Sequence, residues 1–157
     1  MKIIDKESGK EFKAIIEGVA QPDYAEITKD KGFTFDWALE KGNEVYKIYI
    51  KGEEGRILGL LSLTEHQSEF RIHINLIEVT RNNVGRIKKL DNIAGCLIAF
   101  ACSIAFKRGY GGFVSLSPKT KLIDLYQDKY GFRQYGRMLA VEFESSKYLV
   151  DKYISNE

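Results

Sequence analysis

Hydrophobic and polar residues alternate over three stretches in the first half of the chain: Val45 to Lys51, Arg56 to Thr64 and Phe70 to Thr80. Alternation with a period of two is typical of half-buried strands. Gly52 to Gly55 separates the first two stretches, so they predict a hairpin. A weaker run, Phe12 to Val19, predicts another strand before them. The first half of the chain therefore predicts an antiparallel sheet.

The pattern changes at Ile93, where an almost continuous apolar run begins. It predicts a helix to about Lys107 that Gly109 ends. Because the helix is apolar nearly all round, we expect other elements to cover it on several sides. The remaining elements predicted are a strand over Gly112 to Leu116, a helix from Pro118 or Lys119 to about Lys129, a strand over Arg137 to Glu144 and a helix over Ser145 to Tyr153.

Two strands joined by a helix of this length are normally parallel, with a right-handed crossover. The strands Phe70 to Thr80 and Gly112 to Leu116 should therefore form a parallel pair at the centre of the sheet. The fold class predicted is α/β or α+β: a mixed, mostly antiparallel sheet with a parallel central pair, flanked by helices. We expect a single domain over residues 1–157, with the polar residues 1–11 loosely held.

Composition narrows the classes of function. A hydrophobic content of 44% supports a core without a metal or disulfide. The net charge of +2, from 24 basic and 22 acidic residues, makes nucleic acid an unlikely partner. The start of the sequence does not resemble a signal peptide, and the longest apolar run is shorter than the ~20 residues of a membrane helix. We therefore expect no membrane partner. Cys96 and Cys102 lie on different faces of the predicted helix, so we expect no disulfide between them and a cytoplasmic location.

The candidate chemistry lies where the third strand passes through a basic loop into the long helix. The first turn of a helix leaves backbone N–H groups unpaired and carries partial positive charge, so it suits a phosphate or pyrophosphate. Arg86, Lys88 and Lys89 supply positive charge, whereas Asp91 opposes it. Asn92 or Asp91 can also act as an N-cap, and a capped helix beside a solvated loop is the alternative interpretation.

The stretch Leu76 to Gly136 resembles the cofactor-binding core of the GNAT N-acetyltransferases, in particular a poorly characterised bacterial subgroup. The loop of that family, Q/R-x-x-G-x-G/A, matches the run from Leu90 to Gly95, followed by Cys96-Leu97-Ile98. Gly95 keeps the small residue of this motif. Leu90 and Ile93 depart from it.

The second half of the resemblance is the helix before Gly131-Phe132, where the family often reads N-x-x-A-x-x-L-Y. Here the run is Lys119-Thr120-Lys121-Leu122-Ile123-Asp124-Leu125-Tyr126. Tyr126 falls on the tyrosine that in many members gives a proton to the departing thiolate, and Lys119 replaces an Asn that often contacts pantetheine. One extra residue lies between Tyr126 and Gly131.

The resemblance implies an enzyme that transfers an acetyl group from acetyl-CoA (coenzyme A) to a primary amine of a small molecule or protein by direct transfer. Tyr126 is the expected acid, and Glu78, at the end of the third strand, or water is the expected base. No metal site is expected, and a homodimer stays open. The cofactor-binding residues expected are Ile77, Val79, Lys88, Lys89, Asn92, Ile93, Ala94, Gly95, Cys96 and Lys119.

Other interpretations of the same residues remain open. Tyr126 can be a core tyrosine and Glu78 an exposed residue at the strand end, while His73 and His66 are expected to be structural. A non-catalytic module that binds acyl-CoA would fit the departures at Leu90 and Ile93. An acetyltransferase acting on charged tRNA is a third possibility, which the near-neutral charge argues against.

Overall fold

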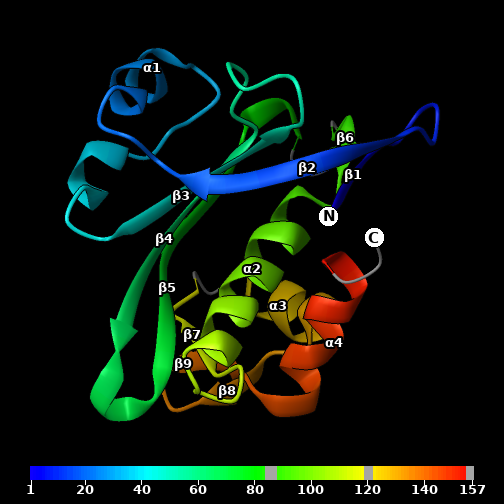
Figure 1. The fold of residues 1–157 in the computed structure, drawn as a ribbon. Helices are drawn as coiled ribbons and strands as arrows, with labels where there is room; N and C mark the ends of the chain where they lie inside the picture. The colour runs from blue at the N-terminus through cyan, green and yellow to red at the C-terminus, as the bar shows by residue number, and fades with distance from the viewer. Residues whose placement is uncertain (84–87, 119–121, 155–157) are drawn as a thin grey trace.

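The structure is a computed structural model that describes residues 1–83, 88–118 and 122–154 (Figure 1). Strands and helices alternate along the second half of the chain, and strands dominate the first half. The strands are β1 Lys2–Asp5, β2 Glu11–Gly18, β3 Glu44–Ile50, β4 Gly59–His66, β5 Arg71–Val79, β6 Leu90–Asp91, β7 Val114–Leu116, β8 Arg133–Tyr135 and β9 Met138–Val141. The helices are α1 Asp23–Lys29, α2 Ile93–Lys107, α3 Ile123–Tyr130 and α4 Phe143–Tyr153, with short 3-10 turns at η1 Trp37–Glu40, η2 Gln67–Glu69 and η3 Arg81–Asn83.

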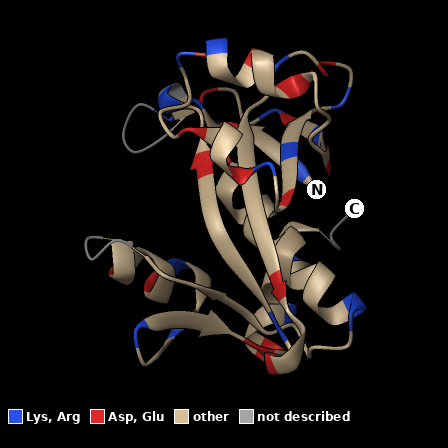
Figure 2. Cartoon of the chain, turned by 90° about the vertical axis from the view of Figure 1, so that its left-hand side faces the viewer, with Lys and Arg blue, Asp and Glu red and all other residues tan. Residues whose placement is uncertain are grey.

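The described strands form one mixed sheet in the order β6-β1-β2-β3-β4-β5-β7-β9-β8. Neighbouring strands are antiparallel except for β5 and β7, which are parallel. The predicted hairpin is β3 and β4, and the predicted parallel pair is confirmed. Figure 2 shows that the middle of the long central strands carries few charged residues, which gather towards the ends of the elements.

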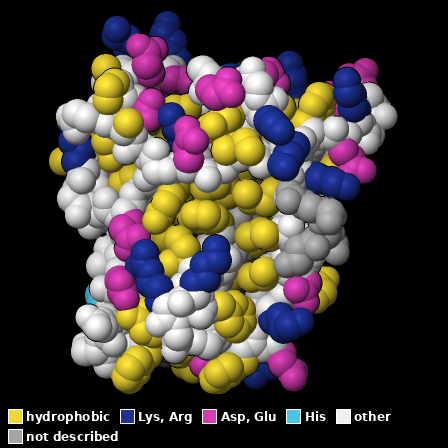
Figure 3. Space-filling model, in the orientation of Figure 1, with side chains coloured by type: hydrophobic (Ala, Val, Ile, Leu, Met, Phe, Trp, Pro, Cys, Tyr) yellow, Lys and Arg dark blue, Asp and Glu magenta, His cyan; other side chains and the backbone are white. Residues whose placement is uncertain are grey.

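Helix α2 is the centre of the larger hydrophobic core. It has the predicted bounds, Ile93 to Lys107, and most of its residues are buried against the sheet and α4. Several partly buried side chains pack against this core, among them Phe12, Ile16, Tyr46 and Phe100. Hydrophobic side chains also gather in the middle of the face shown in Figure 3, in the region where Figure 1 draws α2 below β2. The all-round apolar pattern thus correctly predicted a helix covered on several sides.

Three expectations need correction at the ends of elements. Residues 1–11 are not loosely held, because β1 pairs with β2 and β6 and Ile3 is fully buried. The last strand is shorter than Arg137 to Glu144, since α4 already begins at Phe143, and the exposed strand β8 was missed. Helix α3 begins at Ile123 rather than near Pro118, and residues 119–121 lie outside the described part.

None of the described helices is long and apolar enough to cross a membrane.

Candidate functional site

The pairing of β5 with β7 is short. It runs from Ile72 opposite Val114 to Ile74 opposite Leu116, where β7 ends, whereas β5 continues to Val79. At the same point the register between β5 and β4 shifts, which leaves Asn75 as the extra residue of a β-bulge. Because a bulge bends its strand, the last part of β5 is separated from β7.

The backbone of this last part is directed into the opening. The Thr80 amide donates to the Leu58 carbonyl at 3.0 Å, on the side of β4. Hydrogen-bonding direction alternates along an antiparallel strand, so Glu78 also bonds towards β4, whereas Ile77 and Val79 direct their N–H and C=O groups towards the side of β7. Both residues were predicted to contact the cofactor.

The start of α2 exposes backbone donors beside this opening. Asn92 precedes the helix in a left-handed conformation, φ 76°, which asparagine tolerates better than most residues. Its side chain does not cap the helix, and its amide nitrogen Nδ2 lies 3.5 Å from the Lys2 carbonyl. Within the described part of the chain, the amides of Ile93, Ala94 and Gly95 have no hydrogen-bond acceptor. The alternative interpretation, a helix capped by a side chain, is therefore not what the structure shows, and the donors remain available to an anion.

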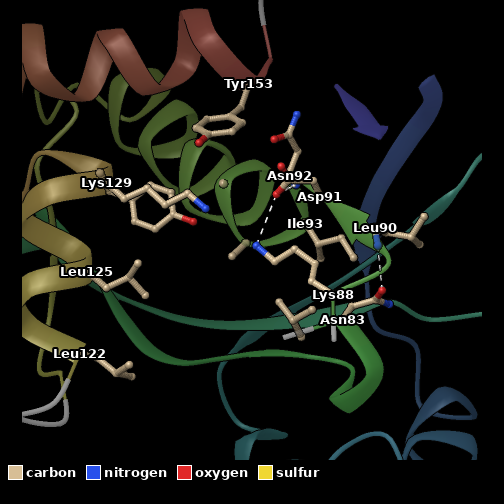
Figure 4. A pocket seen from close by; sticks show the side chains of 14 residues that line it. Asn83, Lys88, Leu90, Asp91, Asn92, Ile93, Leu122, Leu125, Lys129 and Tyr153 are labelled. Atoms are coloured by element: carbon tan, nitrogen blue, oxygen red, sulfur yellow. Dashed lines mark hydrogen bonds and ion pairs between the residues drawn. The ribbon is translucent and has the colours of Figure 1, made fainter. Parts of the chain in front are cut away.

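A cavity of about 430 Å³ lies at this helix start and is called the α2 cavity below. It brings together the end of β5, the residues that lead into α2, one side of α3 and the end of α4 (Figure 4). The residues that line it are Val79, Asn83, Lys88, Leu90, Asp91, Asn92, Ile93, Ala94, Gly95, Leu122, Leu125, Lys129, Tyr130 and Tyr153.

Two lysines and one aspartate set the charge of the α2 cavity. Asp91 accepts from the Asn92 amide at 2.9 Å and lies 3.4 Å from the Lys88 ammonium. Burial favours the neutral acid, but these two contacts outweigh it and hold the pKa of Asp91 below its usual value. Burial and the charge of Lys88 lower the pKa of Lys129. Because Asp91 is already paired, the net charge around the cavity is positive.

Two tyrosines complete the wall. Tyr130 ends α3 and Tyr153 ends α4; they are 5% and 6% exposed, and their ring centroids lie 6.4 Å apart. Burial raises the pKa of both phenols, so they remain protonated donors at neutral pH. The Tyr130 hydroxyl has no hydrogen-bond partner among the residues described. A phenol hydroxyl in a cavity wall, without a protein partner and close to free amides, can donate to an anion.

No protein-family model matches the chain, and no curated protein matches it. Solved structures do match. Spermidine/spermine N-acetyltransferase SpeG from Vibrio cholerae gives a TM-score of 0.60 at 14% identity, covering 87% of this chain and 95% of that chain. A GNAT-family acetyltransferase from Staphylococcus aureus gives 0.57 at 11% identity, covering 84% and 100%.

The structure of AtaTR bound with acetyl-CoA is similar too, with a TM-score of 0.59 at 15% identity, covering 87% of this chain and 97% of that chain.

The chain has the GNAT fold.

Within this GNAT fold, the structure brings most of the predicted binding residues together. Val79, Lys88, Asn92, Ile93, Ala94 and Gly95 line the α2 cavity. Ile77 faces the same opening through its backbone. Lys89 is exposed and does not line the cavity. Lys119 and Arg86 lie outside the described residues.

Cys96 is a correction. Its amide already donates to the Asn92 carbonyl at 2.9 Å, and its side chain is fully buried in the core. Burial raises the pKa of its thiol to about 11 and that of Cys102 to about 12. Both cysteines are free, buried core residues and offer no group to a ligand.

Glu78 is a second correction. Its carboxylate accepts from the Thr34 amide at 2.7 Å, the Thr34 hydroxyl at 2.8 Å and the Trp37 indole at 2.8 Å, with a longer contact from the Phe35 amide at 3.3 Å. These donors belong to the segment that leads from α1 into η1, with Trp37 as the first residue of η1, and they lie on the face of β5 opposite to Val79. A carboxylate saturated in this way fixes that segment to the sheet and is not a free base.

Tyr126 lies one turn before Tyr130 on the same side of α3. Its ring contacts Tyr130, with centroids 6.1 Å apart, and Phe132, at 5.7 Å. It is buried and does not line the α2 cavity, and burial raises the pKa of its phenol. The structure thus keeps Tyr126 protonated and next to a residue of the cavity wall.

Lys129, Tyr130 and Tyr153 line the cavity but were not predicted. The nearest sequence signal is the Gly131-Phe132 pair, which directly follows Tyr130 and marks the end of its helix.

Proposed function

We propose that the chain is an N-acetyltransferase that transfers the acetyl group of acetyl-CoA directly to a primary amine. The observation that carries this proposal is that the α2 cavity, with its free amides and excess positive charge, lies at the end of the part of β5 that has no β7 partner. A pyrophosphate and an extended pantetheine arm need these two features next to each other.

The residues present fit the coenzyme. The amides of Ile93, Ala94 and Gly95 would hold the pyrophosphate, and Lys88 and Lys129 would balance its charge. The unpaired Tyr130 hydroxyl supplies one more donor. The backbone groups of Ile77 and Val79 would pair with the pantetheine amides in place of the missing β7 residues.

The reaction is a direct transfer. The coenzyme supplies an acetyl thioester, an activated acyl group. A backbone N–H of β5 beside the bulge would polarise the thioester carbonyl. The Tyr126 phenol, which burial keeps protonated, holds the proton that the leaving sulfur needs, and water removes the proton from the attacking amine. No side-chain nucleophile takes part.

A binding module without catalysis is the second candidate. It is favoured by the position of Tyr126, which is packed among aromatic rings and does not line the cavity. Neighbours with this fold are named for different acceptors, such as spermidine/spermine and a ribosomal-protein alanine. Because one fold serves many substrates, we assign the acceptor only as a primary amine. The two free buried thiols support the cytoplasm as the compartment.

The proposal is tested in two steps. A ligand that binds only the folded state stabilises it by about 2.7 kcal/mol at 100-fold over its dissociation constant, so acetyl-CoA should raise the melting temperature. Release of free thiol is then measured with a panel of primary amines. Stabilisation without thiol release for any amine would favour the module, and the absence of stabilisation would contradict both functions.

A further inference from the structure

The C-terminal helix reaches the α2 cavity. Helix α4 follows the last pairing of β9 and runs back along α2 (Figure 1). Its last residue, Tyr153, lines the cavity together with the first turn of α2. The predicted coenzyme site thus includes a residue from the far end of the chain.

Tyr153 and Gly95 fit each other closely. A Cβ atom placed on Gly95 would lie 2.3 Å from Cε1, 2.4 Å from Cζ and 2.8 Å from Cδ1 of the Tyr153 ring. Such distances are far below van der Waals contact, so any side chain at position 95 would displace the ring. The glycine is therefore needed for the approach of Tyr153, in addition to any approach of a phosphate.

Tyr153 also lines a second hollow. This hollow, of about 210 Å³, is lined by β1, Asn92 and the end of α4. The Lys152 ammonium lies 5.2 Å from the centroid of the ring. Because Tyr153 lines both hollows, its ring forms part of the wall of the α2 cavity that faces β1.

The polar end of Tyr153 is near the groups that suit an anion. Figure 4 shows the ring over the start of α2, with its hydroxyl on the side of Lys129. Tyr130, which is nine-tenths buried and whose hydroxyl has no partner in the described residues, lies against the same ring. Free amides, two phenols and two ammonium groups thus surround one small volume.

We propose that Tyr153 is a coenzyme-binding residue that closes one wall of the pyrophosphate site and donates its hydroxyl to the pyrophosphate. This inference rests on the proposed function. It also couples the last turn of α4 to the ligand. If bound coenzyme A stabilises the packing of this turn against α2, the packing must strengthen the binding of coenzyme A by the same factor.

The test is a set of dissociation constants measured by calorimetry with coenzyme A, 3′-dephospho-coenzyme A and pantetheine. Tyr153→Phe keeps the ring and removes only the hydroxyl. We expect about tenfold weaker binding of both pyrophosphate-containing ligands, the size of a charge-assisted hydrogen bond, and unchanged binding of pantetheine. Tyr148→Phe is the matched control, because Tyr148 lies on the same helix and is 60% exposed; it should bind all three ligands as the wild type does.

Gly95→Ala tests the wall. Displacement of the ring should weaken the binding of coenzyme A by more than tenfold. It should also speed amide hydrogen exchange in the last turn of α4. In the wild type, coenzyme A should slow that exchange.

The outcomes separate the two proposals. Wild type that binds no coenzyme A would contradict the proposed function itself. If the wild type binds coenzyme A and Tyr153→Phe binds it with equal affinity, the proposed function remains supported and this inference is overturned. An equal loss for pantetheine would also overturn it, because the effect would then not involve the pyrophosphate.

Discussion

Glu78 and Val79 are neighbours in β5, yet their surroundings differ in one respect. On the Glu78 face, donors from Thr34, Phe35 and Trp37 saturate a buried carboxylate. On the Val79 face, amides at the start of α2 and the Tyr130 hydroxyl have no partner among the residues the structure describes. Both faces are polar and largely buried.

The difference shows which polar group to consider functional. Buried polar groups are normally satisfied within the protein. A satisfied group stabilises the fold, whereas unsatisfied donors next to a cavity remain available to a ligand. We therefore assign stability to the Glu78 face and binding to the Val79 face, and the predictions below test this assignment from the largest expected effect to the smallest.

The largest effect is expected for Glu78→Ala. Removing the carboxylate leaves the Thr34 amide and the Trp37 indole buried without an acceptor, so the free energy of unfolding should fall by about 3–5 kcal/mol. Urea unfolding measures it. Glu53→Ala, in the exposed turn after β3, should change stability by less than about 0.5 kcal/mol. A Glu78→Ala protein of normal stability that has lost turnover would reverse the assignment and make Glu78 a base.

Tyr126→Phe tests the proposed acid, which packs against Tyr130 of the cavity wall. Loss of the proton donor should lower turnover about 100-fold, which is at the lower end of general-acid effects, while the affinity for coenzyme A changes less than twofold. Steady-state thiol release with an accepted amine gives both values.

Tyr130→Phe is the matched comparison. It removes the neighbouring hydroxyl, so affinity for coenzyme A should fall and turnover at saturation should not. If the two variants exchanged these effects, Tyr130 and not Tyr126 would be the acid.

A smaller effect is expected for Lys129→Gln. Loss of one positive charge at the α2 cavity should weaken the binding of coenzyme A about fivefold, roughly 1 kcal/mol. It should also reduce the salt dependence of this binding. Titrations at low and high salt measure both. Lys107→Gln, at the exposed other end of α2, should leave affinity and salt dependence as they are; an equal effect there would mean that only overall charge matters.

The smallest effect concerns the pH dependence of stability and His73. Because Asn75 is a bulge, His73 lies on the same face of β5 as Glu78. The half-buried His73 ring lies with Nδ1 3.1 Å from an Arg71 Nη1 and 2.8 Å from the Ser115 hydroxyl. Burial, Arg71 and His66 lower its pKa, so the folded state binds this proton less readily than the unfolded state. The contribution of His73 is therefore full above about pH 6.5 and is lost as the pH falls below it.

His73→Gln isolates this contribution. Between pH 8 and pH 5, the wild type should lose more stability in urea unfolding than the variant does. Identical losses would show that His73 does not couple to folding.

Much of the fold followed from the sequence where a pattern is long and uninterrupted. Helix α2 has its predicted bounds because a continuous apolar run leaves few alternative ends, and β3 and β4 alternate over a full strand. Short elements were less well predicted. Strand β8 consists of exposed residues, and β1 lies in a polar segment whose buried Ile3 gives no periodic signal.

The site was predicted only in its local part. The helix start and Val79 follow from the order strand, loop, helix. Lys129, Tyr130 and Tyr153 come from α3 and α4, and nothing in their spacing shows that these helices converge on the first turn of α2.

The sequence by itself determined the order of elements, the parallel pair and the position of the start of α2, because each depends on local periodicity and on the backbone geometry of a helix end. Only the tertiary structure decided which polar groups are satisfied. A carboxylate such as Glu78 looks the same in a sequence whether it is free or holds a buried segment in place, and its role depends on donors more than 40 residues away in the chain. Likewise, Gly95 matches a phosphate motif in the sequence, but its packing against Tyr153 exists only after α4 has folded back onto α2.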